Sequence, residues 1–270
     1  MCIRDSYVRG VTSVDDELFV LLGRDDNQVA IYSINDYQLM RHVNVPRYKP
    51  GIFSDMTSCV RHKRLYMSDY HNRRIRRYDL ESTSSAVMKR LIRSHIRKWS
   101  VPGEPTGLSV TPSCNLLVTF CNKLVELSAD SGQCVREIAL QLDIECSHHS
   151  VQLTTGQYVV CHGASDNMLH RVCVVGDDCK VTNSYGGQRG SDVRQLNSPC
   201  HLAVDKDSQF IFVTESDNHR VVLLSPTLEF VRYVIEGLLH PHRLCFHQST
   251  RRLFVLCRGW VDSNMTVIQL

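Results

Sequence analysis

The chain has 270 residues, of which 43% are hydrophobic and 22% are charged, and its formal net charge is +3. This composition is that of a globular protein and excludes a disordered or fibrous chain. No run of about 18 apolar residues occurs, so the sequence predicts no membrane-spanning helix and no membrane partner.

The small net charge conceals a strongly basic segment. Residues 61–99 contain twelve Lys and Arg residues against three acidic ones, a net charge of +9, so the rest of the chain carries −6. A separation of this kind points to an acidic partner for the basic segment.

Twelve cysteines raise the question of a disulfide framework. Six of them lie within apolar strand patterns, where a free thiol behaves as a small hydrophobe: Cys59, Cys161, Cys173, Cys200, Cys245 and Cys257. No C-x-x-C pair occurs, so the usual zinc and redox spacings are missing. We therefore expect a reduced, cytoplasmic protein without a cofactor.

The first six residues, Met1–Ser6, fit no strand pattern. They also lack the apolar region of a signal peptide. We expect residues 1–6 to be a non-native or truncated N-terminus, and residues 7–270 to form a single domain.

Six repeats follow, each made of a short apolar strand, a tight turn and a stronger second strand. Their first strands begin at Val11, Met56, Gly107, His148, His201 and Arg243. The mean step of about 46 residues is the period of a propeller blade. The sequence therefore predicts an all-β, six-bladed β-propeller of four-stranded antiparallel blades.

Residues 196–236 are the best-preserved repeat. Four β-prone runs are joined there by three turns, one of them at residues 216–219, where Asp and Asn favour a tight turn. The sixth repeat ends at its third strand, so ring closure would need a strand before Val11, for which Arg4–Arg9 is a poor candidate.

The surplus length of the chain falls between repeats. We expect loops at residues 45–53, 80–104 and 176–198, and loops of this length are where propellers usually carry function.

The turn after the second strand carries a recurrent motif. Residues 215–221 read ESDNHRV and residues 68–75 read SDYHNRRI, and Tyr185-Gly186-Gly187 precedes the fifth repeat. These motifs resemble those of NHL repeats, in which an acid or Ser is followed by Asn, His or Arg, Arg and a branched aliphatic residue. Tyr185-Gly186-Gly187 is similar to the Gly-rich link between blades in that family.

The resemblance implies structural roles for six residues of the motif. Asn tolerates the left-handed turn, and Arg can bond to carbonyls or to an acid of a neighbouring blade. We expect these residues to hold their blades together: Asn72, Arg73, Arg74, Asn218, His219 and Arg220.

The chain is most similar to the C-terminal propeller of tripartite-motif proteins. No RING, B-box or coiled-coil pattern is present, so no ubiquitin-ligase chemistry is expected from these residues. The resemblance implies a non-catalytic binding platform for protein partners, as one module of a larger protein.

Binding of single-stranded RNA is the first alternative, because cations neutralise phosphates and aromatic rings stack on bases. The candidate basic face comprises Arg61, Lys63, Arg64, Tyr70, Arg76, Arg77, Lys89, Arg90, Arg93, Arg97 and Lys98. Arg76 and Arg77 are adjacent on one strand, so they cannot both face one partner.

A metal-dependent hydrolase or lyase is the second alternative, since some propellers of related architecture are such enzymes. The candidate ligands His148-His149 and His240-Pro241-His242 are interpreted as ordinary turn histidines, and the acids fall mostly in turns. No G-x-S-x-G motif occurs. We therefore expect no enzymatic activity, no bound metal and no small-molecule substrate.

Overall fold

The computed structural model describes residues 8–23, 28–46, 48, 50–51, 53–80, 96–163, 165–258 and 263–270. Within these residues every regular element is a β-strand. In this part of the chain no helix is long and apolar enough to cross a membrane.

The first three sheets are four-stranded and antiparallel. Blade 1 contains β1 (Val8–Val14), β2 (Glu17–Leu22), β3 (Gln28–Ser33) and β4 (Leu39–Asn44). Blade 2 contains β5 (Met56–Cys59), β6 (Arg64–Asp69), β7 (Arg74–Asp79) and β8 (Ile96–Ser100). Blade 3 contains β9 (Gly107–Val110), β10 (Leu116–Phe120), β11 (Lys123–Leu127) and β12 (Cys134–Ala139).

The remaining sheets follow the same order, except that the last has three strands in the described residues. Blade 4 contains β13 (Ser147–Gln152), β14 (Tyr158–His162), β15 (His170–Val175) and β16 (Val181–Gly187). Blade 5 contains β17 (Pro199–Val204), β18 (Ile211–Glu215), β19 (Arg220–Leu224) and β20 (Phe230–Glu236). Blade 6 contains β21 (Pro241–His247), β22 (Arg252–Cys257) and β23 (Asn264–Gln269).

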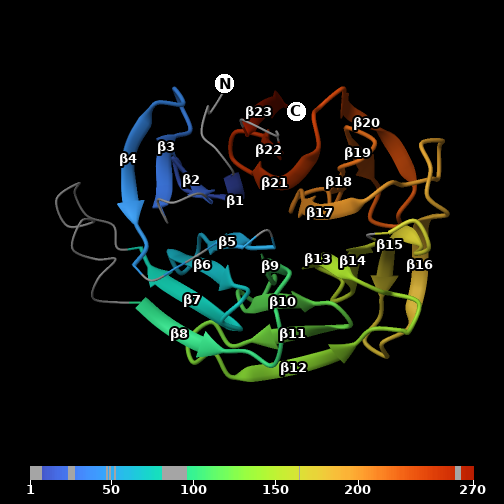
Figure 1. Cartoon of the computed structure of the whole chain (residues 1–270), viewed down its shortest axis with the longest axis horizontal. Helices are drawn as coiled ribbons and strands as arrows, with labels where there is room; N and C mark the ends of the chain where they lie inside the picture. The colour runs from blue at the N-terminus through green and yellow to red at the C-terminus, as the bar shows by residue number, and fades with distance from the viewer. Residues whose placement is uncertain are drawn as a thin grey trace.

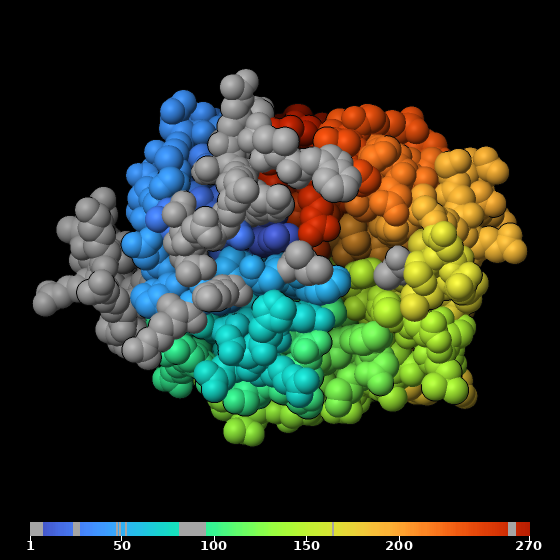
Figure 2. Space-filling model, in the orientation of Figure 1, coloured from blue at the N-terminus to red at the C-terminus, as the bar shows by residue number. Residues whose placement is uncertain are grey.

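The six sheets stand side by side around a central axis, with β1, β5, β9, β13, β17 and β21 innermost (Figure 1). Their outer surfaces follow one another around the ring in chain order (Figure 2). The prediction of an all-β, six-bladed propeller is therefore confirmed.

The hydrophobic core is divided into six clusters, one at each contact between neighbouring blades. Second and third strands are covered on both faces, so β10 and β18 are buried throughout. The outermost β12 buries only Ile138, because it has a neighbour on one side alone. Burial on both faces is why the second strand of each repeat is the most continuously apolar.

Side-chain packing closes the ring between blades 6 and 1. Val11 and Leu18 share one core cluster with Phe254 and Leu256. The Nη1 of Arg252 also donates to the carbonyl oxygen of Ile34 at 2.8 Å. The closing contact in the described chain is thus an ordinary blade interface, with no strand lent from one end of the chain to the other.

The strand pairing shows that three of the six residues predicted to be equivalent between repeats are one residue out of register with the others. A bulge in each of β1, β13, β17 and β21 is followed by the pairs Gly10↔Leu21, His149↔Cys161, His201↔Thr214 and Arg243↔Leu256. The equivalent pair in blade 3 is Gly107↔Thr119, and in blade 2 the amide of Ser68 donates to the carbonyl oxygen of Asp55.

Gly10, Asp55 and His149 therefore replace Val11, Met56 and His148 as the equivalent residues. A slip of one residue moves a side chain to the other face of a strand. The correction thus decides which side chains face the axis.

Two of the three predicted loops are partly strands. Residues 80–104 include β8, and residues 176–198 include β16, so both segments complete their own blades. The predicted link Tyr185-Gly186-Gly187 is the end of β16, where Gly186 pairs with Arg171. A Cβ atom at Gly186 would lie 2.4 Å from the carbonyl oxygen of His170, so the close strand approach requires glycine there.

The repeat motif holds the turn after the second strand, as the blade 5 residues show. Asn218 Nδ2 donates to Glu215 Oε1 at 2.9 Å, and Arg220 Nε donates to Glu215 Oε2. Arg220 Nη1 also reaches the carbonyl oxygen of Ser191 at 2.9 Å, which ties the blade to the preceding segment.

In blade 2 the same role falls to a different arginine. Asn72 Nδ2 donates to Asp69 Oδ1 at 2.8 Å, and Asp69 Oδ2 receives the Nε and Nη2 of Arg76 at 3.0 and 2.7 Å. Arg74, the counterpart of Arg220 in the sequence, is exposed, and so is Arg73. Arg74 and Arg76 lie on the same face of β7, but Arg74 is at the exposed start of the strand and Arg76 is at a buried position further along it. The structural role predicted for Arg74 therefore belongs to Arg76.

Replacing Arg76 by Gln should reduce the free energy of unfolding by about 3–5 kcal/mol, because it leaves the buried Asp69 carboxylate without its cation. The matched change Arg74→Gln, at the exposed start of the same strand, should alter the free energy of unfolding by no more than about 0.5 kcal/mol. Urea unfolding of both variants measures the difference. Equal losses would contradict this assignment of the structural arginine.

Candidate functional site

Six equivalent positions surround the axis, and four of them carry ionisable side chains. Asp55, His149, His201 and Arg243 come from blades 2, 4, 5 and 6, and their exposed fractions are 1%, 2%, 5% and 7%. Glycine fills the other two positions in blades 1 and 3. A Cβ atom at Gly107 would lie 2.6 Å from the carbonyl oxygen of His148, so these glycines make room for their neighbours. We call the four side chains the axial cluster.

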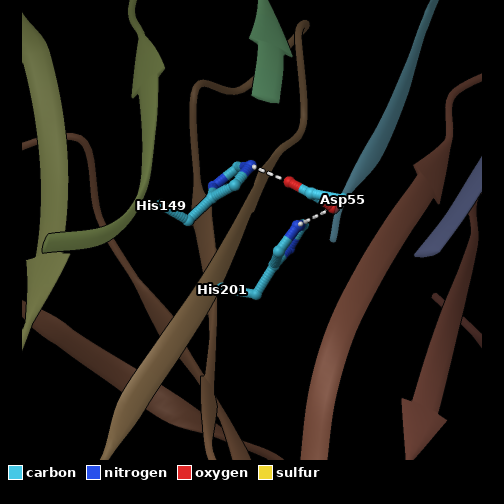
Figure 3. A group of neighbouring side chains, drawn as sticks. All are labelled: Asp55, His149 and His201. Carbon is cyan, nitrogen blue, oxygen red and sulfur yellow. Dashed lines mark ion pairs between the residues drawn. The ribbon is translucent and has the colours of Figure 1, made fainter. Parts of the chain in front are cut away.

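The carboxylate of Asp55 lies at the centre of the axial cluster. Its Oδ2 accepts the amide of Leu108 at 2.8 Å, and its Oδ1 accepts the amide of Met56 at 2.9 Å. The Nε of Arg243 lies 3.2 Å from Oδ1. Both imidazoles point at the same carboxylate (Figure 3). A buried carboxylate with this many partners is held as the anion.

The hydrogen bonds of His149 define its tautomer. Its Nδ1 accepts the amide of Leu202 at 3.4 Å, so Nε2 carries the proton and donates to the carbonyl oxygen of Leu108 at 3.0 Å. The same Nε2 lies 3.7 Å from Asp55 Oδ2. His149 therefore binds blades 2, 3 and 5 while it is neutral.

His201 repeats this arrangement one blade later. Its Nδ1 accepts the amide of Leu244 at 3.3 Å, and its Nε2 faces Asp55 Oδ1 at 3.5 Å. The rings of His149 and His201 are stacked with their centroids 3.8 Å apart. Stacking at this distance favours neutral rings, because two imidazolium ions would repel each other.

The axial cluster caps the free edges of the innermost strands. Asp55 caps Leu108 in the next blade, His149 caps Leu202 and His201 caps Leu244. Arg243 Nη2 then donates to the carbonyl oxygen of Ser54 at 3.1 Å, which returns the series to blade 2. Because an innermost strand has an unpaired edge, these bonds satisfy backbone groups that would otherwise be buried alone.

Burial and charge set the protonation of the cluster. Burial, together with the neighbouring His201, lowers the pKa of His149 to about 3. Burial also lowers the pKa of His201. Burial alone would raise the pKa of Asp55, but the charge of Arg243 and the bond from His201 hold that pKa below its usual range. At neutral pH the cluster is one carboxylate, one guanidinium and two neutral imidazoles.

Asp55, His149 and His201 could offer three metal-ligand atoms within 4.8 Å of one another. Two features oppose a resident cation there. The guanidinium of Arg243 already neutralises the carboxylate, and each Nε2 carries a proton because the matching Nδ1 accepts an amide. The donor set therefore fits an internal hydrogen-bonded ring better than a metal ion.

A cavity of about 410 Å³ follows the axis beyond the cluster and is bounded by the turns after the innermost strands. His149 and His201 form its inner end, and polar wall positions include Thr12, Ser13 and Ser58. These hydroxyls bond to one another and to the wall: Thr12 Oγ1 meets Ser58 Oγ at 2.8 Å, and Ser58 Oγ donates to the carbonyl oxygen of Ser13 at 2.8 Å.

The structure separates the residues of the predicted basic face. Arg76 and Arg77 are both 3% exposed. Arg77 Nη1 donates to the carbonyl oxygens of Ala129 and Asp130 at 2.9 and 3.0 Å, and Arg64 Nη1 donates to that of Ala129 at 3.0 Å. Arg64, Arg76 and Arg77 thus link parts of the propeller and do not present their charges on an outer face.

The other candidates occupy three different places. Arg61 and Lys63 lie in the turn after β5, Tyr70 lies in the turn at the opposite end of β6, and Arg97 and Lys98 lie exposed on β8. Lys63 forms an ion pair with Asp15 of blade 1. Lys89, Arg90 and Arg93 lie outside the described residues. RNA binding stays a prediction, and within the described chain it rests on Arg61, Arg97 and Lys98.

Sequence reasoning passes over Asp55 and places His201 on a strand without assigning it to a site, and His201 does lie within β17. It interprets His148, His149, His240 and His242 as turn residues. His149 lies within β13 and His242 within β21, whereas His240 is in a turn, where its Nδ1 lies 3.6 Å from Asp217 Oδ1. His242 donates through Nε2 to the carbonyl oxygen of Val8 at 3.1 Å. The available signal was the polar residue at the start of several innermost strands, but the alignment was one residue out of step in three blades.

No protein-family model matches the chain, and no curated protein sequence matches it. Several solved structures do. Virginiamycin B lyase from Staphylococcus aureus is 11% identical with a TM-score of 0.63, over 99% of this chain and 86% of that one. The Cps50 (Swd1) β-propeller domain of Myceliophteria thermophila is 12% identical with a TM-score of 0.60, over 96% and 83%.

A protein of unknown function from Bacteroides thetaiotaomicron is 12% identical with a TM-score of 0.72, over 98% of this chain and 70% of that one. The similar structures thus include an enzyme and a propeller domain of another kind. At these identities the likeness shows the fold, and the fold alone does not specify an activity.

The stability of the protein should fall as the pH is lowered from about 6.5. His149 and His201 are neutral in the folded state, whereas an unfolded His takes up a proton near pH 6.5, so the unfolded state binds more protons below that pH. Each such His should reduce the free energy of unfolding by about 1.4 kcal/mol per pH unit until its folded pKa is reached.

His149→Gln tests this origin, since an amide can still donate to Leu108 and accept from Leu202. Its slope between about pH 6 and 4 should be smaller than that of the unaltered protein by about 1.4 kcal/mol per pH unit. Urea titrations across this range measure the slopes. His62→Gln, at an exposed turn position, is the control. An unchanged slope in His149→Gln would exclude this source of pH dependence.

Proposed function

We propose that this propeller is a non-catalytic binding platform for a protein partner. The observation that carries the proposal is the open hollow at the turns after the innermost strands. Both aliphatic and polar side chains line this hollow. The axial cavity of about 410 Å³ continues there into a second hollow of about 350 Å³. A concave patch with an apolar centre and a polar rim is typical of recognition surfaces.

Two features of the described wall support the non-catalytic part of the proposal. A nucleophile needs a base within hydrogen-bond reach, but Ser13 Oγ meets the thiol of Cys245 at 3.4 Å. Burial raises the pKa of Cys245 to about 11, so that sulfur stays a thiol. His247, which also lines the cavity, bonds through Nδ1 to Thr250 and through Nε2 to the carbonyl oxygen of Asp15 at 2.9 Å. Ser249 Oγ lies 3.4 Å from the same Nε2, but this nitrogen donates its proton to Asp15 and so is not free to act as a base for the serine.

The NHL-like motifs support the same proposal. The two turns that carry them, at Asp69–Arg76 and Glu215–Arg220, are bound within the propeller through buried ion pairs. Such turns stabilise a scaffold, which leaves recognition to other surfaces. We further propose that the chain is an NHL-type propeller that serves as one module of a larger, tripartite-motif-like protein.

Capture from a nuclease-treated lysate, followed by titration of the purified partner, tests the function. We expect one protein to bind saturably with a dissociation constant of about 1 μM or tighter, which is within reach of an interface of standard size. The urea-unfolded chain on the same support is the control for non-specific adsorption. The chain refolded from urea on that support should capture the partner again.

Two results would overturn the proposal. Capture that disappears with nuclease would favour the RNA alternative instead. A divalent-metal-dependent hydrolysis of esters by the purified chain, lost in His201→Gln while the far-ultraviolet circular dichroism is unchanged, would show that the axial cluster is catalytic.

A further inference from the structure

The two hollows on the turn face form one continuous funnel. They share six wall residues: Ser58, Val60, Val110, Val151, Val204 and Lys206. The inner hollow ends at His149 and His201, and the outer one is bounded by turns of blades 2 to 5. We use the name funnel for both hollows together.

Aliphatic side chains line the middle of the funnel. Val60, Val110, Val151 and Val204 come from four successive blades, near the ends of their innermost strands. Val60 is 45% exposed, which is large for a valine beside a hollow. The removal of such surface from water favours binding by about 25 cal/mol per Å², so an aliphatic side chain of a ligand would be drawn in here.

The charged groups at the rim are unbalanced. Arg61 and Lys206 are exposed, and within the described chain neither side chain has an ion-pair or hydrogen-bond partner. Two nearby acids have cationic partners: Asp15 pairs with Lys63, and the buried carboxylate of Asp205 binds Ser208, Gln248 and Arg251. Asp16 and Asp207 are exposed, and Asp207 bonds to the neutral amide of Gln248. The rim therefore offers two cations that no ion pair of the described chain engages.

The side chain of Lys206 lies where the two hollows join, since Lys206 lines both of them. The backbone amide of Lys206, bonded to Gln248 Oε1 at 3.1 Å, fixes the base of this side chain.

A buried hydroxyl in the wall also lacks a partner. Ser109 is 7% exposed, lines the inner hollow, and its Oγ makes no hydrogen bond in the described structure. Buried hydroxyls are nearly always satisfied, so this group is set to meet a polar atom of a ligand or of water.

We infer that the funnel binds an acidic, extended segment of the protein partner, with one aliphatic side chain among the four valines and carboxylates facing Arg61 and Lys206. The inference rests on the proposed function and gives the partner its chemistry. A free aliphatic carboxylate shares part of that chemistry, but a peptide with several acids can engage both cations and the aliphatic wall at once.

Selection from a random octapeptide library displayed on phage tests the inference directly. The expected pool is enriched in Asp and Glu next to Leu, Ile or Val. The best peptide, made synthetically with an uncharged fluorophore, should bind the double variant Arg61→Glu/Lys206→Glu at least about tenfold more weakly, and the loss should shrink as salt is raised. Octanoate is titrated alongside as the small carboxylate.

Lys180→Glu is the matched control, because Lys180 is an exposed lysine in a turn of blade 4 and lines neither hollow. Val151→Trp, which fills the funnel without altering its charge, should also abolish binding. The inference would be overturned by any of four results: selected peptides that are basic or neutral, no selection at all, equal binding by the double variant, or octanoate that binds as tightly as the peptide. A partner that the double variant still captures from lysate would leave the platform intact and exclude only the funnel.

Discussion

The hydrogen bonds around Asp55 are the constraint on which this propeller depends. Six sheets that meet at an axis each present an unpaired strand edge to the centre, and a buried peptide group without a partner is costly. Asp55, His149 and His201 each cap the strand of the following blade, and Arg243 returns the series to blade 2. Gly10 and Gly107 complete the arrangement by leaving space.

This solution determines what remains for function. Each imidazole uses Nδ1 as an acceptor for a backbone amide, and the carboxylate is shared by amides, a guanidinium and both rings. Groups so fully bonded are poor general bases, since a proton transfer would break the bonds that orient them. The polar groups of the axial cluster are thus engaged in hydrogen bonds that hold the blades together. Arg61 and Lys206 at the turn face make no such bonds through their side chains in the described chain.

The two motif turns show how one physical role can move along a sequence. Glu215 in blade 5 and Asp69 in blade 2 occupy the same place, and each binds a buried arginine. The arginine is Arg220 in one case and Arg76 in the other, because a guanidinium on a long flexible stem can reach the same carboxylate from two positions along the strand. Sequence alignment alone would have chosen Arg74, whose side chain points to solvent.

The sequence by itself determined the fold: alternating β-prone runs, tight turns and a repeat of about 46 residues predict six blades, and all six occur. Only the tertiary structure decided which residues meet. Arg64 and Arg77 belong to a basic cluster in the sequence, but in the structure both donate hydrogen bonds to the carbonyl oxygen of Ala129 in the next blade. Asp55 and Arg243 are 188 positions apart and form an ion pair. Local periodicity is encoded within a few neighbouring residues. The axial cluster, in contrast, takes one residue from each of several distant repeats. An error of one residue in the alignment of the repeats therefore places the wrong side chains at the axis.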